Sequence, residues 1–178
     1  MGQFVNDIQG IRKRAREHMG DGAVTAGYKA DREQVIKVLN EVLATEIVCT
    51  LRYKRHYYMA DGLNSESVKQ EFLEHANDEQ MHADMVAERI TQLGGEPDFN
   101  PKTLATRSHA EYIEGDTLRS MVEEDLVAER IAVETYSEVA RWLGTNDPTS
   151  RRVIETLLQK EEEHAEDMKT LLGRLPSE

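Results

Sequence analysis

The chain has little of what stabilises or anchors several large classes of protein. It contains one cysteine, Cys49, so no disulfide can form within the chain, and a reducing compartment such as the cytoplasm is expected. No apolar run approaches the roughly 20 residues that span a bilayer. The first 19 residues also lack the apolar stretch of about 7–15 residues found in secretory signals. We therefore expect a cytoplasmic protein with no membrane partner.

Positive charge is also scarce, and what there is gathers at one end. The net charge is −12. Residues 1–30 carry five basic and three acidic side chains, for +2, so the remaining 148 residues carry −14. An acidic body of this kind argues against nucleic-acid binding by the chain as a whole. It attracts cations instead, metal ions included.

Four long segments show helical periodicity, and no segment shows a strand pattern. Asp31 and Gln34 form a capping-box pattern, and Asn64 or Ser65 is expected to cap the second helix. Asp147, followed by proline at the favoured first helical position, is expected to cap the fourth. The expected helices cover residues 31–60, 64–93, 116–143 and 147–173.

The lengths of the connections predict the topology. Short turns near 61–64 and 144–147 make the first two and the last two helices antiparallel neighbours. The connection from about 95 to 115 can run the length of a bundle, so the second and third helices can be parallel. We expect an all-α four-helix bundle with one long crossover. The expected parts are an N-terminal arm at 1–30, the bundle at 31–173 and a short tail at 174–178.

The inward-facing seam of every helix is apolar at both ends and polar near its middle. Burying four carboxylates together is costly, because each loses its hydration and each raises the pKa of the others. Two divalent cations supply about +4 to offset about −4. Carboxylates with imidazoles suit iron or manganese better than structural zinc. The candidate metal ligands and catalytic residues are Glu46, Glu79, His82, Glu129, Glu161 and His164.

The two halves of the chain repeat the same pattern. Glu46 precedes the first Glu-x-x-His by 33 residues, and Glu129 precedes the second by 32. A tyrosine, Tyr53 or Tyr136, follows each of these lone glutamates by seven residues. An internal pseudo-two-fold axis would place one Glu and one Glu-x-x-His on each side of a dinuclear centre.

Each residue also has a more ordinary interpretation. A run such as 161–163 is usually a solvated helix face, and a lone histidine is usually an ordinary polar residue. Cys49 is expected to be a small buried hydrophobe, and Trp142 is expected to serve packing. The combination of six residues on four seams with matched halves favours the metal site.

Four further residues stand near the expected centre. Tyr53 and Tyr136 are either hydrogen-bonding partners of the ligands or plain core aromatics. Asp125, one turn before the third-helix glutamate, either orients a histidine ligand or is solvated. His75 is a candidate for an extra ligand.

The six-residue pattern resembles the ferroxidase centre of bacterioferritins, over residues 31–173. The resemblance implies a ferritin-like bundle with two iron ions per subunit. It implies that Glu46 and Glu129 are terminal ligands, that Glu79 and Glu161 bridge the ions, and that each histidine completes one ion. The tyrosine and aspartate at 53 and 125 also match positions beside the ligands in that family.

The sequence departs from bacterioferritins in two places. The methionine that binds haem directly after the second-helix glutamate is replaced by Gln80, and Met81 points about 100° further round the helix. We therefore expect no haem. Only 14 residues follow His164, which leaves no room for the fifth helix of 24-subunit cages. The outline is similar to Dps-like proteins, so a homo-oligomeric shell of 12 subunits is favoured over 24.

The function that the resemblance implies is oxidation of Fe(II) by O2 or H2O2, followed by iron storage in the shell. One alternative is a Dps-like protein that protects DNA through its basic arm, from Arg12 to Arg16, and consumes peroxide. Another is a dimanganese enzyme that destroys peroxide with similar ligands.

Overall fold

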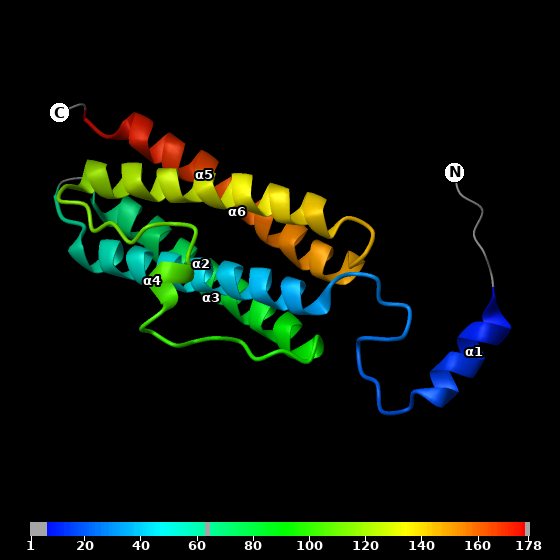
Figure 1. The fold of residues 1–178 in the computed structure, drawn as a ribbon. Helices are drawn as coiled ribbons and strands as arrows, with labels where there is room; N and C mark the ends of the chain where they lie inside the picture. Colours follow the sequence, from blue (N-terminus) through cyan, green and yellow to red (C-terminus); the bar gives the residue numbers. More distant parts are fainter. Residues whose placement is uncertain (1–6, 63–64, 177–178) are drawn as a thin grey trace.

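The computed structural model describes residues 7–62 and 65–176, and all regular structure in these residues is helical. Four long helices form the bundle, and two short helices lie outside it (Figure 1). The helices are α1 (Ile8–Glu17), α2 (Arg32–Met59), α3 (Ser65–Gln92), α4 (Leu104–Arg107), α5 (Leu118–Leu143) and α6 (Pro148–Arg174).

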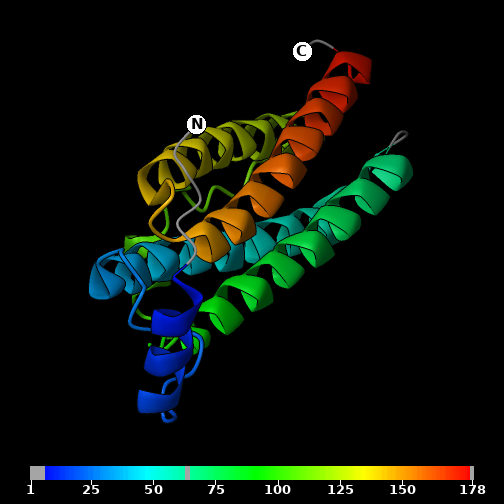
Figure 2. The same cartoon turned by 90° about the vertical axis from the view of Figure 1, so that its right-hand side faces the viewer.

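The long helices pack as two antiparallel pairs, α2 with α3 and α5 with α6 (Figures 1 and 2). The connection 93–117, which contains α4, runs back along the bundle and contacts α2. It brings the chain to the end where α3 began, so α3 and α5 are parallel. The predicted all-α bundle with one crossover is confirmed.

The helix starts follow the capping chemistry of the sequence. The Asp31 side chain accepts a hydrogen bond from the backbone N–H of Gln34 at 3.2 Å, and Asp147 accepts from that of Ser150 at 2.9 Å. Helix α5 begins slightly later than the expected start near 116, because Thr117 caps it in a capping box with a serine. The other expected cap, Asn64, lies outside the described residues.

The apolar core is divided into two parts by the polar middle of the bundle. One cluster contains Leu39, Val86 and Ile154 and lies toward the start of α2. The other contains Phe72, Val122 and Met168 and lies toward the end of α2. Packing on both sides therefore surrounds the central carboxylates with apolar side chains.

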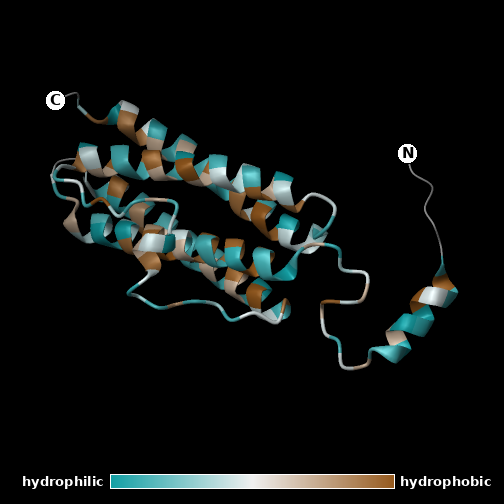
Figure 3. Ribbon diagram, viewed as in Figure 1, coloured by the Kyte–Doolittle hydropathy of each residue, from teal (hydrophilic) through white to brown (hydrophobic). Residues whose placement is uncertain are grey.

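The N-terminal arm stands apart from the bundle, beyond the end at which α2 begins (Figure 1). None of the residues of α1 is buried, and most of its surface is hydrophilic (Figure 3). Tyr28, just before α2, donates a hydrogen bond to Asp147 at 2.8 Å and so fixes the junction.

Trp142, which was expected to serve packing, lies on the surface with 48% of its area exposed. It occupies the outer face of α5, one residue before the buried Leu143. Among the described residues, no helix combines the length and the hydrophobicity needed to cross a bilayer.

Candidate metal centre

The six predicted ligands meet at the centre of the bundle, and each is at most 4% exposed. Each long helix contributes one glutamate, and α3 and α6 each add a histidine one turn further on. Because residues three apart share a helix face, each Glu-x-x-His presents both side chains to the same interior point. The structure thus brings together Glu46, Glu79, His82, Glu129, Glu161 and His164.

His82 marks the first of two groups of possible ligands. Its Nδ1 atom lies 3.1 Å from Glu46 Oε2, 3.0 Å from Glu161 Oε1 and 3.6 Å from Glu79 Oε2. One ligand atom from each of these four side chains lies within 4.8 Å of the others. Four donors at this spacing can surround a single ion.

His164 marks the second group. Its Nδ1 atom lies 3.5 Å from Glu79 Oε1, 3.7 Å from Glu161 Oε2 and 4.0 Å from Glu129 Oε2. The two groups share Glu79 and Glu161, which offer different oxygens to each. The shared glutamates lie where bridging ligands of an ion pair would lie, and Glu46 and Glu129 lie at the two outer ends.

The predicted pseudo-two-fold relation extends to the two tyrosines. The Tyr53 hydroxyl donates a hydrogen bond to Glu129, and the Tyr136 hydroxyl donates one to Glu46. Each tyrosine therefore reaches across the bundle to the lone glutamate of the opposite half. These contacts fix the outer carboxylates in place.

Asp78 orients one of the histidines, and nothing in its spacing distinguished it in the sequence. Its Oδ2 atom lies 3.2 Å from His164 Nε2. An imidazole that donates its Nε2 proton to a carboxylate keeps the lone pair of Nδ1 for a metal ion. In the second half of the chain, the corresponding position before Glu161 is Lys160, so the two histidines have different surroundings.

Three buried polar atoms at the centre make no hydrogen bond within the described structure: Glu79 Oε1, Glu161 Oε1 and His164 Nδ1. Leaving such atoms without partners is costly. All three are electron-pair donors that face the shared interior. The set of oxygen and nitrogen donors fits a pair of divalent transition-metal ions.

The electrostatics of the centre indicate competition between protons and cations. Burial and the charge of Glu79 raise the pKa of Glu46 to about 8. Burial, with the charges of Glu79 and Glu161, raises the pKa of Glu129 well above its usual range. Burial alone would lower the pKa of His164, but the nearby carboxylates of Glu161 and Glu79 raise it to about 11. Divalent ions can replace these protons and balance the charge.

Asp125 does not orient His82 or His164, which corrects one of its two expected roles; it is fully buried, so it is not solvated either. Its Oδ1 atom accepts from Arg52 Nε at 2.8 Å, and its Oδ2 lies 2.8 Å from His56 Nδ1. Both partners also bond to backbone carbonyls of the crossover. This network ties the crossover to the bundle beside the centre.

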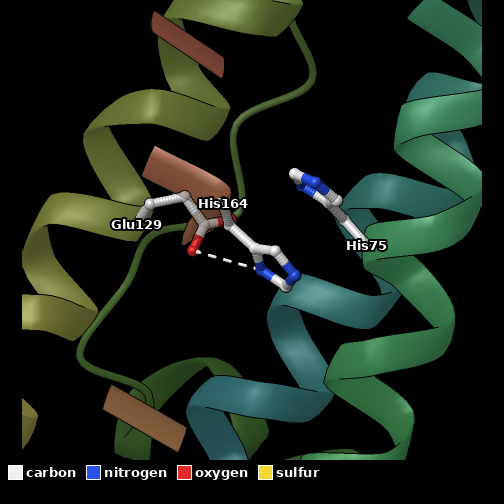
Figure 4. A group of neighbouring side chains, drawn as sticks. All are labelled: His75, Glu129 and His164. Atoms are coloured by element: carbon white, nitrogen blue, oxygen red, sulfur yellow. Dashed lines mark ion pairs between the residues drawn. The ribbon is translucent and has the colours of Figure 1, made fainter. Parts of the chain in front are cut away.

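His75 is buried next to the six residues and forms a further group of possible ligands with two of them, Glu129 and His164, with one ligand atom of each within 4.8 Å of the others. Its ring stacks on that of His164, with the centroids 3.8 Å apart. Figure 4 shows the His164 ring between His75 and Glu129. The His75 Nδ1 atom lies 3.1 Å from the Tyr53 hydroxyl.

Comparisons with known proteins agree with this architecture. A family model described as a ferritin-like domain matches residues 36–177. A bacterioferritin from Desulfovibrio desulfuricans is 29% identical over 78% of this chain and 75% of its own. Its structure covers 80% of both chains at 25% identity with a TM-score of 0.71.

Two further relatives point in different functional directions. A nutrient stress-induced DNA-binding protein from a Nostoc species is 30% identical, over 79% of this chain and 78% of its own. A dodecameric thioferritin, the bacterioferritin-related protein of Bacteroides fragilis, has a TM-score of 0.79 at 29% identity and covers 82% of this chain and 88% of its own. With the matched family domain spanning most of the chain, the protein belongs to the ferritin-like family.

Proposed function

We propose that this protein is a ferroxidase that binds two Fe(II) ions as substrate at the buried centre and oxidises them. The observation that carries the proposal is the pair of four-residue groups that share Glu79 and Glu161. Two ions in these positions would be close enough to deliver two electrons to one oxidant molecule. Each Fe(II) loses one electron, and O2 or H2O2 takes up the pair together with protons.

The side chains have distinct tasks in this proposal. Glu46 and Glu129 each hold one ion at an outer end, positioned by the tyrosine hydroxyl of the opposite half. Glu79 and Glu161 bridge, and the Nδ1 atoms of the two histidines complete the two sites. The apolar clusters on both sides exclude bulk water, which strengthens the attraction between the carboxylates and the ions.

Anaerobic titration with Fe(II), followed by addition of oxidant, tests the proposal. We expect saturation near two ions per subunit and a loss of rapid oxidation in the double variant Glu46→Ala/Glu129→Ala. A matched control is Glu33→Ala/Glu134→Ala, which removes exposed glutamates from the same two helices. Rapid oxidation by the first variant at the wild-type rate would refute the proposal.

The proposed oxidation of Fe(II) and the relatives of this chain support a homo-oligomeric shell that stores the ferric product. The Bacteroides fragilis relative is described as dodecameric. We therefore favour 12 subunits over 24. Native mass spectrometry tests this point directly, because the two assemblies differ twofold in mass.

A second candidate function is DNA binding by the arm. Helix α1 carries four basic residues and one acidic residue, and all of its side chains are accessible. Such a helix attracts phosphates electrostatically. The name of the Nostoc relative includes DNA binding.

Gel shifts at low salt separate this function from iron oxidation. If the arm binds DNA, the variant Arg12→Gln/Arg16→Gln should bind more weakly than wild type, and added salt should weaken both. Iron oxidation should be unchanged in this variant, because α1 makes no contact with the centre. Equal shifts for the two proteins would exclude the arm as the binding element.

A further inference from the structure

A further group of possible ligands lies between the buried centre and the surface. It consists of Glu71 and His75 on α3 and Asp167 on α6. One ligand atom of each lies within 4.8 Å of the other two. None of the three belongs to the six residues of the dinuclear centre.

The spacing of these atoms is too long for hydrogen bonds and suits a shared ion. His75 Nε2 lies 3.8 Å from Asp167 Oδ2 and 4.0 Å from Glu71 Oε2. Ligand atoms lie about 2.1 Å from a small divalent ion, so two ligands of one ion are separated by about 3.0–4.2 Å. Both distances from His75 fall in this interval.

The hydrogen bonds of His75 show which nitrogen faces the group. The Tyr53 hydroxyl gives its proton to Glu129, so its oxygen accepts a hydrogen bond from His75 Nδ1, 3.1 Å away. With the proton of the neutral ring on Nδ1, Nε2 carries a lone pair. The side chain is only 2% exposed, and this lone pair points toward the carboxylates of Glu71 and Asp167.

Exposure falls step by step from this group to the dinuclear centre. The Asp167 side chain is 57% exposed and that of Glu71 is 39% exposed. His75 is buried, and its ring stacks on His164. The group therefore lies at the solvent end of a continuous path of ligand atoms into the bundle.

We propose that Glu71, His75 and Asp167 form a third divalent-cation site, adjacent to the dinuclear centre and open to solvent. The identity of the ion as Fe(II) rests on the ferroxidase function proposed above. A site of mixed exposure beside a buried one suits an ion that must lose its hydration shell in stages.

Binding of Co(II) under anaerobic conditions tests the third site, because Co(II) matches the donor set and is not readily oxidised. Wild type should saturate at three Co(II) ions per subunit, and Glu71→Gln/Asp167→Asn should saturate at two. The control Glu74→Gln/Glu166→Gln removes two nearby exposed carboxylates from the same helices and should still bind three. Two ions in wild type, or three in the first variant, would overturn the inference.

A further variant separates this inference from the proposed function. Glu79→Ala/Glu161→Ala, which removes the two shared glutamates and keeps the Tyr53–Glu129 contact, should lose the dinuclear ions and keep one Co(II), which anomalous diffraction should place beside His75 Nε2. If wild type bound a single Co(II) at that atom, the third site would stand and the dinuclear proposal would fall. If diffraction showed two ions between the six central residues and none at His75, the dinuclear proposal would stand and the third site would fall.

Discussion

At the residue scale, two tyrosine hydroxyls hold the outer carboxylates of the centre. Tyr136 bonds to Glu46 and Tyr53 to Glu129, and both rings are fully buried. A ligand whose position is fixed before the ion arrives loses less freedom on binding. Outer partners of this kind typically change metal affinity about 10–100-fold.

The variants Tyr136→Phe and Tyr53→Phe should therefore bind Fe(II) at least about tenfold more weakly than wild type, while keeping the fold. Anaerobic titration measures the effect. Tyr58→Phe is the control, because Tyr58 lies on the same helix as Tyr53 with its side chain exposed. The affinity of this control for Fe(II) should not change. Unaltered affinity in both buried variants would show that the hydroxyls do not position the ligands.

The raised pKa values of Glu46 and His164 predict that metal binding releases protons. With values of about 8 and about 11, both groups hold protons at neutral pH. An ion can bind only after these protons leave, so affinity should increase as the pH rises from about 6 to about 8. Calorimetric titration with Co(II) in two buffers of different ionisation enthalpy measures the release. A binding heat independent of the buffer would contradict the prediction.

At the element scale, the helices and their seams could be predicted and the crossover contacts could not. Glu46, Glu79, Glu129 and Glu161 were placed correctly inside the bundle because helical periodicity assigns each residue to a face. Buried Arg52 was missed, because arginine on a helix is normally solvated and its partners lie on α5 and in an irregular connection. Contacts of that kind depend on tertiary packing rather than on spacing.

Two other positions show the same limit. Trp142 was expected to serve packing, but its position on α5 leaves about half of it exposed. Asp78 looked like any acidic residue of α3, and only the packing of α3 against α6 places it beside His164. Helical spacing predicts the face within one helix, whereas pairs between helices depend on how the helices are rotated and aligned.

The turn between α5 and α6 depends on one carboxylate that serves three elements. Asp147 caps α6, accepts from Arg89 of α3 at 3.0 Å, and accepts from Tyr28 of the arm. Burial would raise the pKa of Asp147, but hydrogen bonds from Ser150 and Tyr28 and the charge of Arg89 lower it. Its stabilising effect is therefore complete above the usual pKa of aspartate and is lost as the pH falls through the lowered value.

Asp147→Asn should lower the free energy of unfolding by about 3 kcal/mol at neutral pH, because buried Arg89 loses its counter-charge. The difference from wild type should persist down to about pH 4 and shrink only below it. Urea unfolding at several pH values measures it. Asp31→Asn, at the exposed cap of α2, should change stability by no more than about 0.5 kcal/mol. A difference that shrank between pH 7 and 5 would contradict this assignment.

At the scale of the whole molecule, metal binding and folding are linked through the buried carboxylates. A ligand at about 100 times its dissociation constant stabilises the folded state by about 2.7 kcal/mol per site. For a chain of this size, each kcal/mol of added stability raises the melting temperature, Tm, by roughly 2–4 °C. Saturating Co(II) should therefore raise Tm by on the order of 10 °C, and removal by a chelator should reverse the rise.

Glu46→Ala/Glu129→Ala should lose most of this Tm increase. In the presence of a chelator, the Tm of this variant should fall by no more than two cavity-forming substitutions account for. The loss of two buried acidic groups also removes the cost of burying them without an ion. Differential scanning calorimetry with and without Co(II) gives both values. An equal rise in this variant and in wild type would place the stabilising ions elsewhere on the acidic surface.

All six central side chains belong to one polypeptide, and this has a consequence for assemblies of unequal subunits. If intact and disabled copies are refolded together in varying ratios, every intact copy carries a complete set of ligands whatever its neighbours are. The rate of iron oxidation should then decline linearly with the disabled fraction. A centre built between two copies would instead lose activity as the square of the intact fraction.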